Sequence, residues 1–171
     1  MKRAWTVALC LVLAGLLGGS FLSFNGLRNE ALAVFAAEVA PEINRMLDLA
    51  HSMMREFERY APDTQEFRDI AAGMAMDISR TEAELARMGA VAAGPAGLLH
   101  HARAMERATA RFALSEESAR RLRNFRYDLE EAHDILRASR YNAMAGAFNE
   151  ATRQGLGFLY APLGNDLPVF E

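Results

Sequence analysis

The chain has 171 residues, 51% of them hydrophobic and 24% charged, which predicts one ordinary domain with enough apolar mass for a core. Its formal net charge is −3, and without Lys2 and Arg3 the body holds 17 arginines against 22 acidic residues, a balance of −5. A mildly acidic body argues against general nucleic-acid binding, so no nucleic-acid partner is expected. The single Cys10 lies in an N-terminal apolar run, which excludes disulfides and cysteine metal sites within the domain.

The first expected element is a membrane span. After Arg3 the next charged residue is Arg28, and the run from Trp5 to Phe24 is about as long as a helix needs to cross the hydrocarbon core. By the positive-inside rule, the two cations at the start place the N-terminus in the cytoplasm and the body outside. The alternative is a cleaved signal peptide, because Gly18-Gly19-Ser20 are small enough for a cleavage site. We predict an anchor over residues 1–24 and an extracytoplasmic domain over residues 25–171.

Apolar periodicity in the body predicts helices and no strands. In the first helix, apolar residues recur at alternating steps of four and three from Val39 to Tyr60, which is typical of a helix that packs along a heptad seam. This helix is expected to end before Pro62. Pro41 lies inside the pattern and lacks a backbone donor, so we expect a kink or a break near Val39.

Three further helices are predicted. Asp63 and Glu66 form a capping box for the second, which should end in the loop at Gly89–Gly97. The third helix, after this loop, is the shortest. Ser115 caps a fourth helix that should run to about Gln154. Four antiparallel helices with short connections make an all-α up-and-down bundle, whose first helix can continue directly out of the membrane span.

An aromatic residue followed by asparagine recurs in the chain. The three pairs are Phe24-Asn25, Tyr141-Asn142 and Phe148-Asn149. The last two are seven residues apart, close to two helical turns, so both rings lie on one helix face with both asparagines beside them. The favoured interpretation is that the rings cover the end of the core, while the asparagines bond to a neighbouring helix or to water. The alternative makes the stripe a docking surface.

Paired motifs recur in a fixed order from one end of the body to the other. They are Phe24-Asn25, Arg28-Asn29, Asp48-Leu49, Tyr60-Ala61, the two aromatic-asparagine pairs of the last helix, and the terminal Phe170-Glu171. In this order and spacing the chain resembles the LemA family. It departs from the family pattern at Ala50-His51-Ser52, where the family usually has Ile-Pro-Asn, and over residues 155–169, as a divergent member would. The resemblance implies a membrane-tethered helical bundle of the bacterial envelope and supplies no catalytic residues.

A metal site is the chemistry most worth testing, because four-helix bundles can hold di-iron centres through Glu-x-x-His pairs. The two near-matches are Glu130-Glu131-Ala132-His133 and Asp48-Leu49-Ala50-His51. The apolar seams place His51 and His133 at the flank of the core, partly exposed, so neither is expected to ligate a metal. His100 and His101 are adjacent and cannot both face one centre, which favours solvated or capping roles. No phosphate loop or nucleophile elbow is present, so we expect neither cofactor nor enzymatic activity.

One basic row lies on the third predicted helix. Arg103, Arg107 and Arg111 follow one another at steps of four and should face outward. The favoured interpretation is a solvated face paired with glutamates of neighbouring helices, and the alternative is contact with anionic lipid headgroups or an acidic partner. The candidate interaction surface therefore comprises this row and the three aromatic-asparagine pairs.

The sequence favours a single-pass protein of the bacterial inner membrane whose periplasmic bundle binds other envelope proteins, alone or as a homo-oligomer. A bundle that senses a small extracytoplasmic ligand is the main alternative, and a metal-binding bundle is a weaker one. Residues 155–171 mix glycine, proline and large apolar side chains, and either cover the bundle as a lid or act as a binding tail.

Overall fold

The predicted all-α class is confirmed by the computed structural model, which describes residues 2–60, 62–86, 93–111, 115–154 and 166–170. Side chains at 2–11, 13–14, 16–17 and 93 lie outside this description, and the described part of the chain contains no strand. Its elements are α1 (Lys2–Val34), the π-helical turn η1 (Phe35–Val39), α2 (Ala40–Tyr60), α3 (Gln65–Ala86), α4 (Ala93–Thr109), α5 (Glu116–Ala138) and α6 (Arg140–Arg153).

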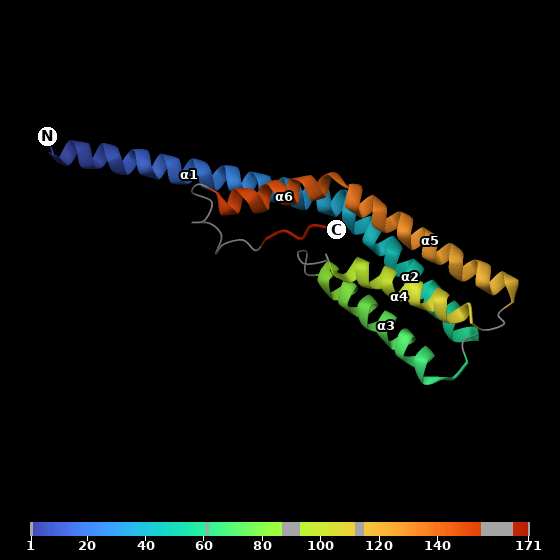
Figure 1. Ribbon diagram of the computed structural model, residues 1–171. Coiled ribbons are helices and arrows are strands. Elements are labelled where there is room, and N and C mark those ends of the chain that lie inside the picture. Colours follow the sequence, from blue (N-terminus) through green and yellow to red (C-terminus); the bar gives the residue numbers. More distant parts are fainter. Residues whose placement is uncertain (1, 61, 87–92, 112–114, 155–165, 171) are drawn as a thin grey trace.

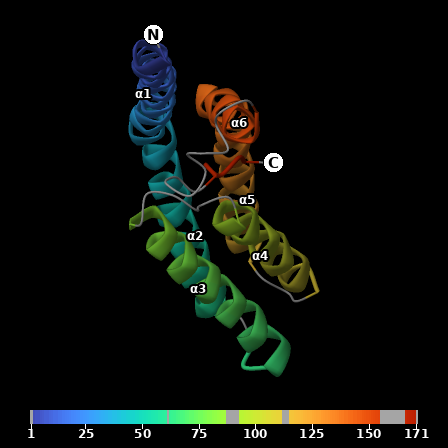
Figure 2. The same ribbon diagram turned by 90° about the vertical axis from the view of Figure 1, so that its left-hand side faces the viewer.

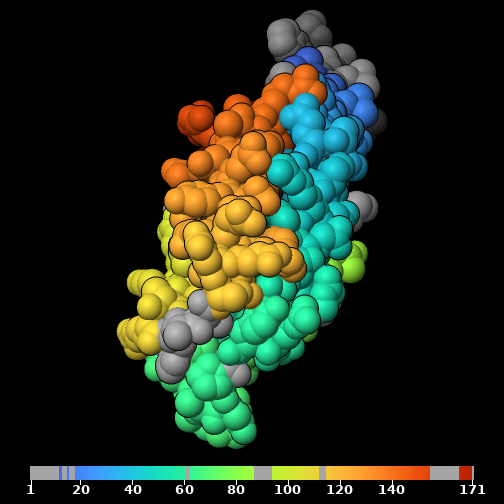
Figure 3. Space-filling view, turned by 90° about the vertical axis from the view of Figure 1, so that its right-hand side faces the viewer, coloured from blue at the N-terminus to red at the C-terminus, as the bar shows by residue number. Residues whose placement is uncertain are grey.

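Helices α2 to α5 form the antiparallel four-helix bundle (Figure 1). Helix α2 packs against α3 and α5, while α4 packs against α3 and α5 and also contacts α2. In the space-filling view α2 and α5 lie side by side (Figure 3). The predicted seam of the first helix is buried from Val39 to Phe57, and its last member, Tyr60, is 39% exposed at the helix end. The periodic residues therefore build the core that the heptad pattern predicts.

The first helix is distorted where Pro41 enters it. The N–H of Ala40 donates to the carbonyl of Phe35, five residues earlier, which makes η1 a π-helical turn directly before the proline. Because Pro41 has no N–H to give, a regular helix would leave a carbonyl of the preceding turn without its partner. The π turn absorbs this disruption near Val39, as predicted, and the chain continues into α2 without a break.

The predicted fourth helix is wrong in one respect: it is divided at Ser139 into α5 and α6. Ser139 has extended backbone angles, φ −63° and ψ 146°. Its N–H and hydroxyl both donate to the carbonyl of Leu136, at 3.2 and 2.7 Å. Asn142 Nδ2 also donates to the carbonyl of Arg137 at 2.8 Å. These short polar side chains satisfy the last carbonyls of α5 locally, and α6 then runs beside α1 (Figure 2).

Two other predicted helix starts are displaced. Helix α3 begins at Gln65, after Thr64, whose carbonyl accepts from the Arg68 N–H at 3.1 Å, so Asp63 does not occupy the cap position. Helix α4 begins at Ala93 and takes up the end of the loop predicted to reach Gly97. Pro95 is compatible with this start because a proline in the first helical turn gives up no internal hydrogen bond.

The N-terminal part of α1 projects beyond α6 and the bundle (Figure 1). Phe24 is the first buried residue among its described side chains, and before it Val12 and Leu22 are 58% and 73% exposed. Over the part of the chain that the structure describes, no helix combines the length and the apolar character needed to cross a membrane. The predicted anchor, residues 1–24, falls largely on side chains outside that part.

Candidate functional site

The two aromatic-asparagine pairs of α6 face the junction of α1, α6 and the chain's own C-terminal segment, residues 166–170. Tyr141 and Phe148 are 1% and 0% exposed. The Phe148 ring lies 4.6 Å from that of Phe24, and the Tyr141 ring lies 5.2 Å from that of Phe35, measured between centroids. Phe170 of the C-terminal segment lies 6.0 Å from Tyr141. The rings therefore continue the hydrophobic core between α1 and α6, as the favoured interpretation of the stripe predicts for them. The predicted partners of the asparagines, a neighbouring helix or water, are incomplete, because both amides bond to the C-terminal segment.

The asparagines beside these rings hold the C-terminal segment by its backbone. Asn142 donates from Nδ2 to the carbonyl of Phe170 at 3.0 Å and accepts at Oδ1 from the Phe170 N–H at 2.9 Å. Asn149 makes the same pair of bonds with Leu167, both at 2.7 Å. We call Asn142 and Asn149 the asparagine clamp. Each amide pairs with the N–H and C=O of one residue, and we call each such pair of hydrogen bonds a rung.

The spacing of the clamp fits an extended chain. Seven helical residues separate the two asparagines, a rise of about 10.5 Å. Leu167 and Phe170 are three residues apart, with Pro168 between them. Polyproline II backbone repeats every three residues over about 9 Å, so it presents the N–H and C=O groups of both residues to the same side. Both rungs can therefore form at once, with the segment running antiparallel to α6. The seven-residue interval of the asparagines on α6 therefore matches three residues of the bound segment.

The remaining pair, Phe24-Asn25, is split between two environments. Phe24 is 7% exposed and faces α6 through Phe148, whereas Asn25 is half-buried on α1. Sequence reasoning identified the stripe but not its occupant, because residues 166–170 carry no periodic pattern. Of the last seventeen residues, 155–165 and 171 lie outside the described residues. The part that is described acts as a bound tail.

Burial of Tyr141 should make the stability of the protein depend on pH in the alkaline range. Desolvation raises the pKa of Tyr141 from its ordinary value near 10 to about 12. As pH rises past 10 the unfolded chain loses the phenol proton while the folded protein keeps it, so the free energy of unfolding should fall until about pH 12. Tyr141→Phe should flatten this fall in urea titrations followed by circular dichroism. Tyr60→Phe, which removes a phenol at a 39% exposed position outside this site, is measured beside it as the control. Parallel curves for Tyr141→Phe and wild type would contradict the assignment.

The arginine row predicted for the third helix lies on α4 only at Arg103 and Arg107, because α4 ends at Thr109 and Arg111 follows in a turn. Two of the three arginines are tied to neighbouring helices. Arg103 donates from Nε and Nη2 to one carboxylate oxygen of Glu130 on α5, at 3.0 and 2.8 Å. Arg111 reaches Glu66 on α3 at 3.0 Å, and Arg107 donates from Nε to the carbonyl of Arg103 at 3.2 Å. Two of the three cations thus have glutamate partners, which favours the interpretation of a solvated, paired face.

The histidines of the two near-matches occupy different environments. The side chain of His51 is 40% exposed, and its Nε2 lies 3.4 Å from Glu82 Oε1. This agrees with the partly exposed flank position predicted for His51. His133 is only 8% exposed, so its predicted partial exposure is wrong. Burial lowers the pKa of His133, which favours the neutral imidazole in the folded protein. Among the described residues, no three histidine, cysteine or acidic side chains lie close enough together to hold a metal ion.

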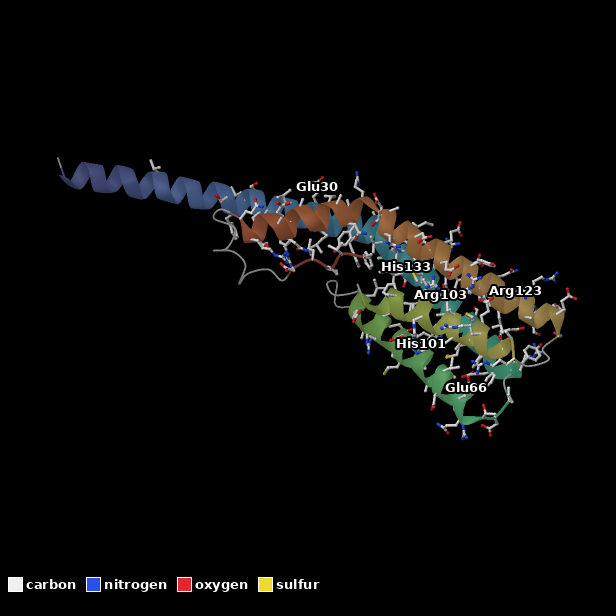
Figure 4. All side chains as sticks on the ribbon, viewed as in Figure 1. Glu30, Glu66, His101, Arg103, Arg123 and His133 are labelled. Atoms are coloured by element: carbon white, nitrogen blue, oxygen red, sulfur yellow. The ribbon has the colours of Figure 1, made fainter. Side chains whose placement is uncertain are left out.

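His101 is a second correction, since it forms a part-buried contact with Asp77 instead of a solvated or capping one. His101 lies on α4, which packs against α3 (Figure 4). Its Nδ1 lies 2.8 Å from Asp77 Oδ2 on α3, and Asp77 is only 4% exposed. The other carboxylate oxygen lies 3.4 Å from Arg80 Nη1. The imidazole fits because Gly73 has no side chain: a Cβ there would lie 2.2 Å from His101 Nε2. Since Nε2 faces the α3 backbone, this pair joins the two helices.

Comparison with known proteins adds no relative: no family model, curated protein or solved structure matches the chain.

Proposed function

We propose that the protein is a membrane-tethered, non-enzymatic interaction module of the bacterial envelope, of LemA type, with its N-terminus in the cytoplasm and its bundle in the periplasm. The observation that carries the proposal is the form of α1. Its charge-free half projects away from the packed elements with Val12 and Leu22 exposed, while its other half packs against α6. A lipid environment would cover these apolar side chains, which water does not favour.

The continuity of the first helix supports the same proposal. Helix α1 passes through η1 into α2 without a loop, so a membrane that holds its N-terminal half also fixes the position of the bundle. Lys2 and Arg3 precede the charge-free run and favour the cytoplasmic placement of the N-terminus. The asparagine clamp supports the interaction role because main-chain recognition of an extended segment is a recurring mode of peptide binding.

The anchor is tested by the mass and extractability of the native protein. Protein from its own membranes should have the full-length mass and resist alkaline carbonate washing. Leu13→Arg combined with Leu16→Arg should release it, because each arginine at the centre of a span opposes insertion by roughly 2.5–3.5 kcal/mol. Ile135→Arg, on an exposed position of α5, is the control and should leave the protein membrane-bound. A mass lacking about twenty residues, with the protein in the soluble periplasm, would overturn the anchor in favour of a signal peptide.

A further inference from the structure

The asparagine clamp recognises features that do not depend on the segment belonging to the same chain. Its four hydrogen bonds go to the N–H and C=O groups of Leu167 and Phe170. The side chains of these two residues are 5% and 4% exposed, so apolar contacts at both positions add to the backbone bonds. Arg153 Nη2 pairs with Asp166 at 2.8 Å beside the first rung. The complete ligand is an extended Asp-Leu-x-x-Phe segment.

The connection to this segment is much longer than docking within one chain requires. Helix α6 ends at Arg153, and Leu167 is bound at Asn149, one helical turn earlier, a rise of about 6 Å. The intervening chain, residues 154–166, has a covalent reach of roughly 40 Å when fully extended. That reach is enough to place the same segment on the clamp of an adjacent molecule.

We propose that the asparagine clamp is a peptide-binding site that can also bind the C-terminal segment of a second copy of the protein. The second copy carries a segment that fits both rungs, both apolar positions and Arg153. Exchange is reciprocal, because each copy gives one segment and receives one, so a pair closes with two-fold symmetry. The proposal rests on the proposed function, because the membrane anchor supplies the local concentration that favours exchange, while the binding site itself is tested without a membrane.

Local concentration decides between the closed monomer and the exchanged pair. A short linker presents its own segment at an effective concentration of about 1 mM, so a dilute molecule keeps its segment on its own clamp. Copies gathered in one membrane plane would approach this concentration. Segment exchange then gains no new contact and loses none, and it links neighbouring bundles.

Two complementary full-length variants test the exchange. The first carries Asn142→Ala and Asn149→Ala and keeps its segment, while the second carries Leu167→Asp and Phe170→Asp and keeps its clamp. Neither can dock a segment within its own chain. Their mixture should form a heterodimer detected by light scattering, whereas each variant alone should remain monomeric. A synthetic peptide with the sequence of residues 165–171 should dissociate the pair.

Controls separate binding from folding. Asn142 also bonds to the end of α5, so Asn149→Ala alone serves as a second clamp variant that leaves this bond in place. Asn149→Ala is added to the variant that carries Leu167→Asp and Phe170→Asp, and binding of the synthetic peptide, carrying a label, is measured. The substitution should weaken peptide binding at least tenfold, whereas Asn124→Ala, on an exposed position of α5, should not change it. Absence of both peptide binding and heterodimer up to about 1 mM, with helicity intact, would overturn the site. Peptide binding without a heterodimer would overturn the second copy as partner. Neither result depends on whether the protein is membrane-bound.

Discussion

Phe148→Ala is expected to lower the free energy of unfolding by about 3–5 kcal/mol. The Phe148 ring is 0% exposed and lies between α1 and α6, 4.6 Å from the Phe24 ring. Alanine would leave a cavity between these helices, because the backbone positions of α1 and α6 are fixed by the rest of their contact. Asn149 follows Phe148 on the same helix, so the clamp should loosen as well. Urea unfolding followed by circular dichroism measures the first effect, and the rate of limited proteolysis near the C-terminus measures the second.

Ile135→Ala is the matched control for this substitution. Ile135 is 45% exposed on α5, and truncation of an apolar side chain at the surface should change stability by only about 0.5 kcal/mol. Phe148→Leu should lie between the two, since leucine fills much of the site. If Phe148→Ala were no more destabilising than Ile135→Ala, the contact between α1 and α6 would not be part of the cooperative fold.

The core of the bundle could be predicted because helical periodicity is a local property of the sequence. A residue every three or four positions must face the same side of a helix, so the line from Val39 to Phe57 identifies its own buried face. The same periodicity does not predict where the helix ends, and Tyr60 is exposed because it is the last residue of α2. A distortion near Val39 was predictable for the same reason, since Pro41 removes a donor whatever it packs against, although its form as a π turn was not.

The division at Ser139 could not be predicted from periodicity, because Leu136 and Tyr141 are both buried and apolar residues continue across the break. The break depends on competition between helical and local hydrogen bonds, which Ser139 and Asn142 decide in favour of the latter. Docking of the C-terminal segment is even harder to predict from the sequence. It depends on a match between the spacing of two asparagines on α6 and the spacing of two residues in the C-terminal segment. This match is visible only once the segment is placed against the helix.

The contact between His101 and Asp77 was missed because it depends on which helices are neighbours. Both residues lie on otherwise ordinary helical sequence, and only the packing of α3 against α4 brings them to 2.8 Å. The signal that could have found it is the set of glycines on these helices. A Cβ at Gly97 would lie 2.5 Å from Asp77 Oδ2, and one at Gly94 would lie 2.3 Å from Thr81 Oγ1. Glycines inside helices are unfavourable unless a neighbour needs the space, so their presence indicates close approach.

Gly73→Ala tests this close approach and is expected to destabilise the protein by about 1–3 kcal/mol. The three atoms nearest to the added methyl group all belong to the His101 ring, at 2.2, 2.7 and 3.1 Å. The ring must therefore move, and its bond to Asp77 is then strained or lost. Gly146→Ala is the control, because a Cβ at Gly146 meets nothing within 4 Å and the change should stabilise α6 by about 0.5–1 kcal/mol through helix propensity.

The decisive measurement is the same substitution in a chain that also carries His101→Ala. Without the imidazole, the methyl group at Gly73 no longer meets the three atoms that oppose it, so Gly73→Ala should change sign and stabilise the double variant by up to about 1 kcal/mol relative to His101→Ala alone. Such a reversal arises only if the two residues are in direct contact, because distant substitutions add. Equal destabilisation in both backgrounds would mean that Gly73 is needed for some other reason, and the position of His101 against α3 would then be wrong.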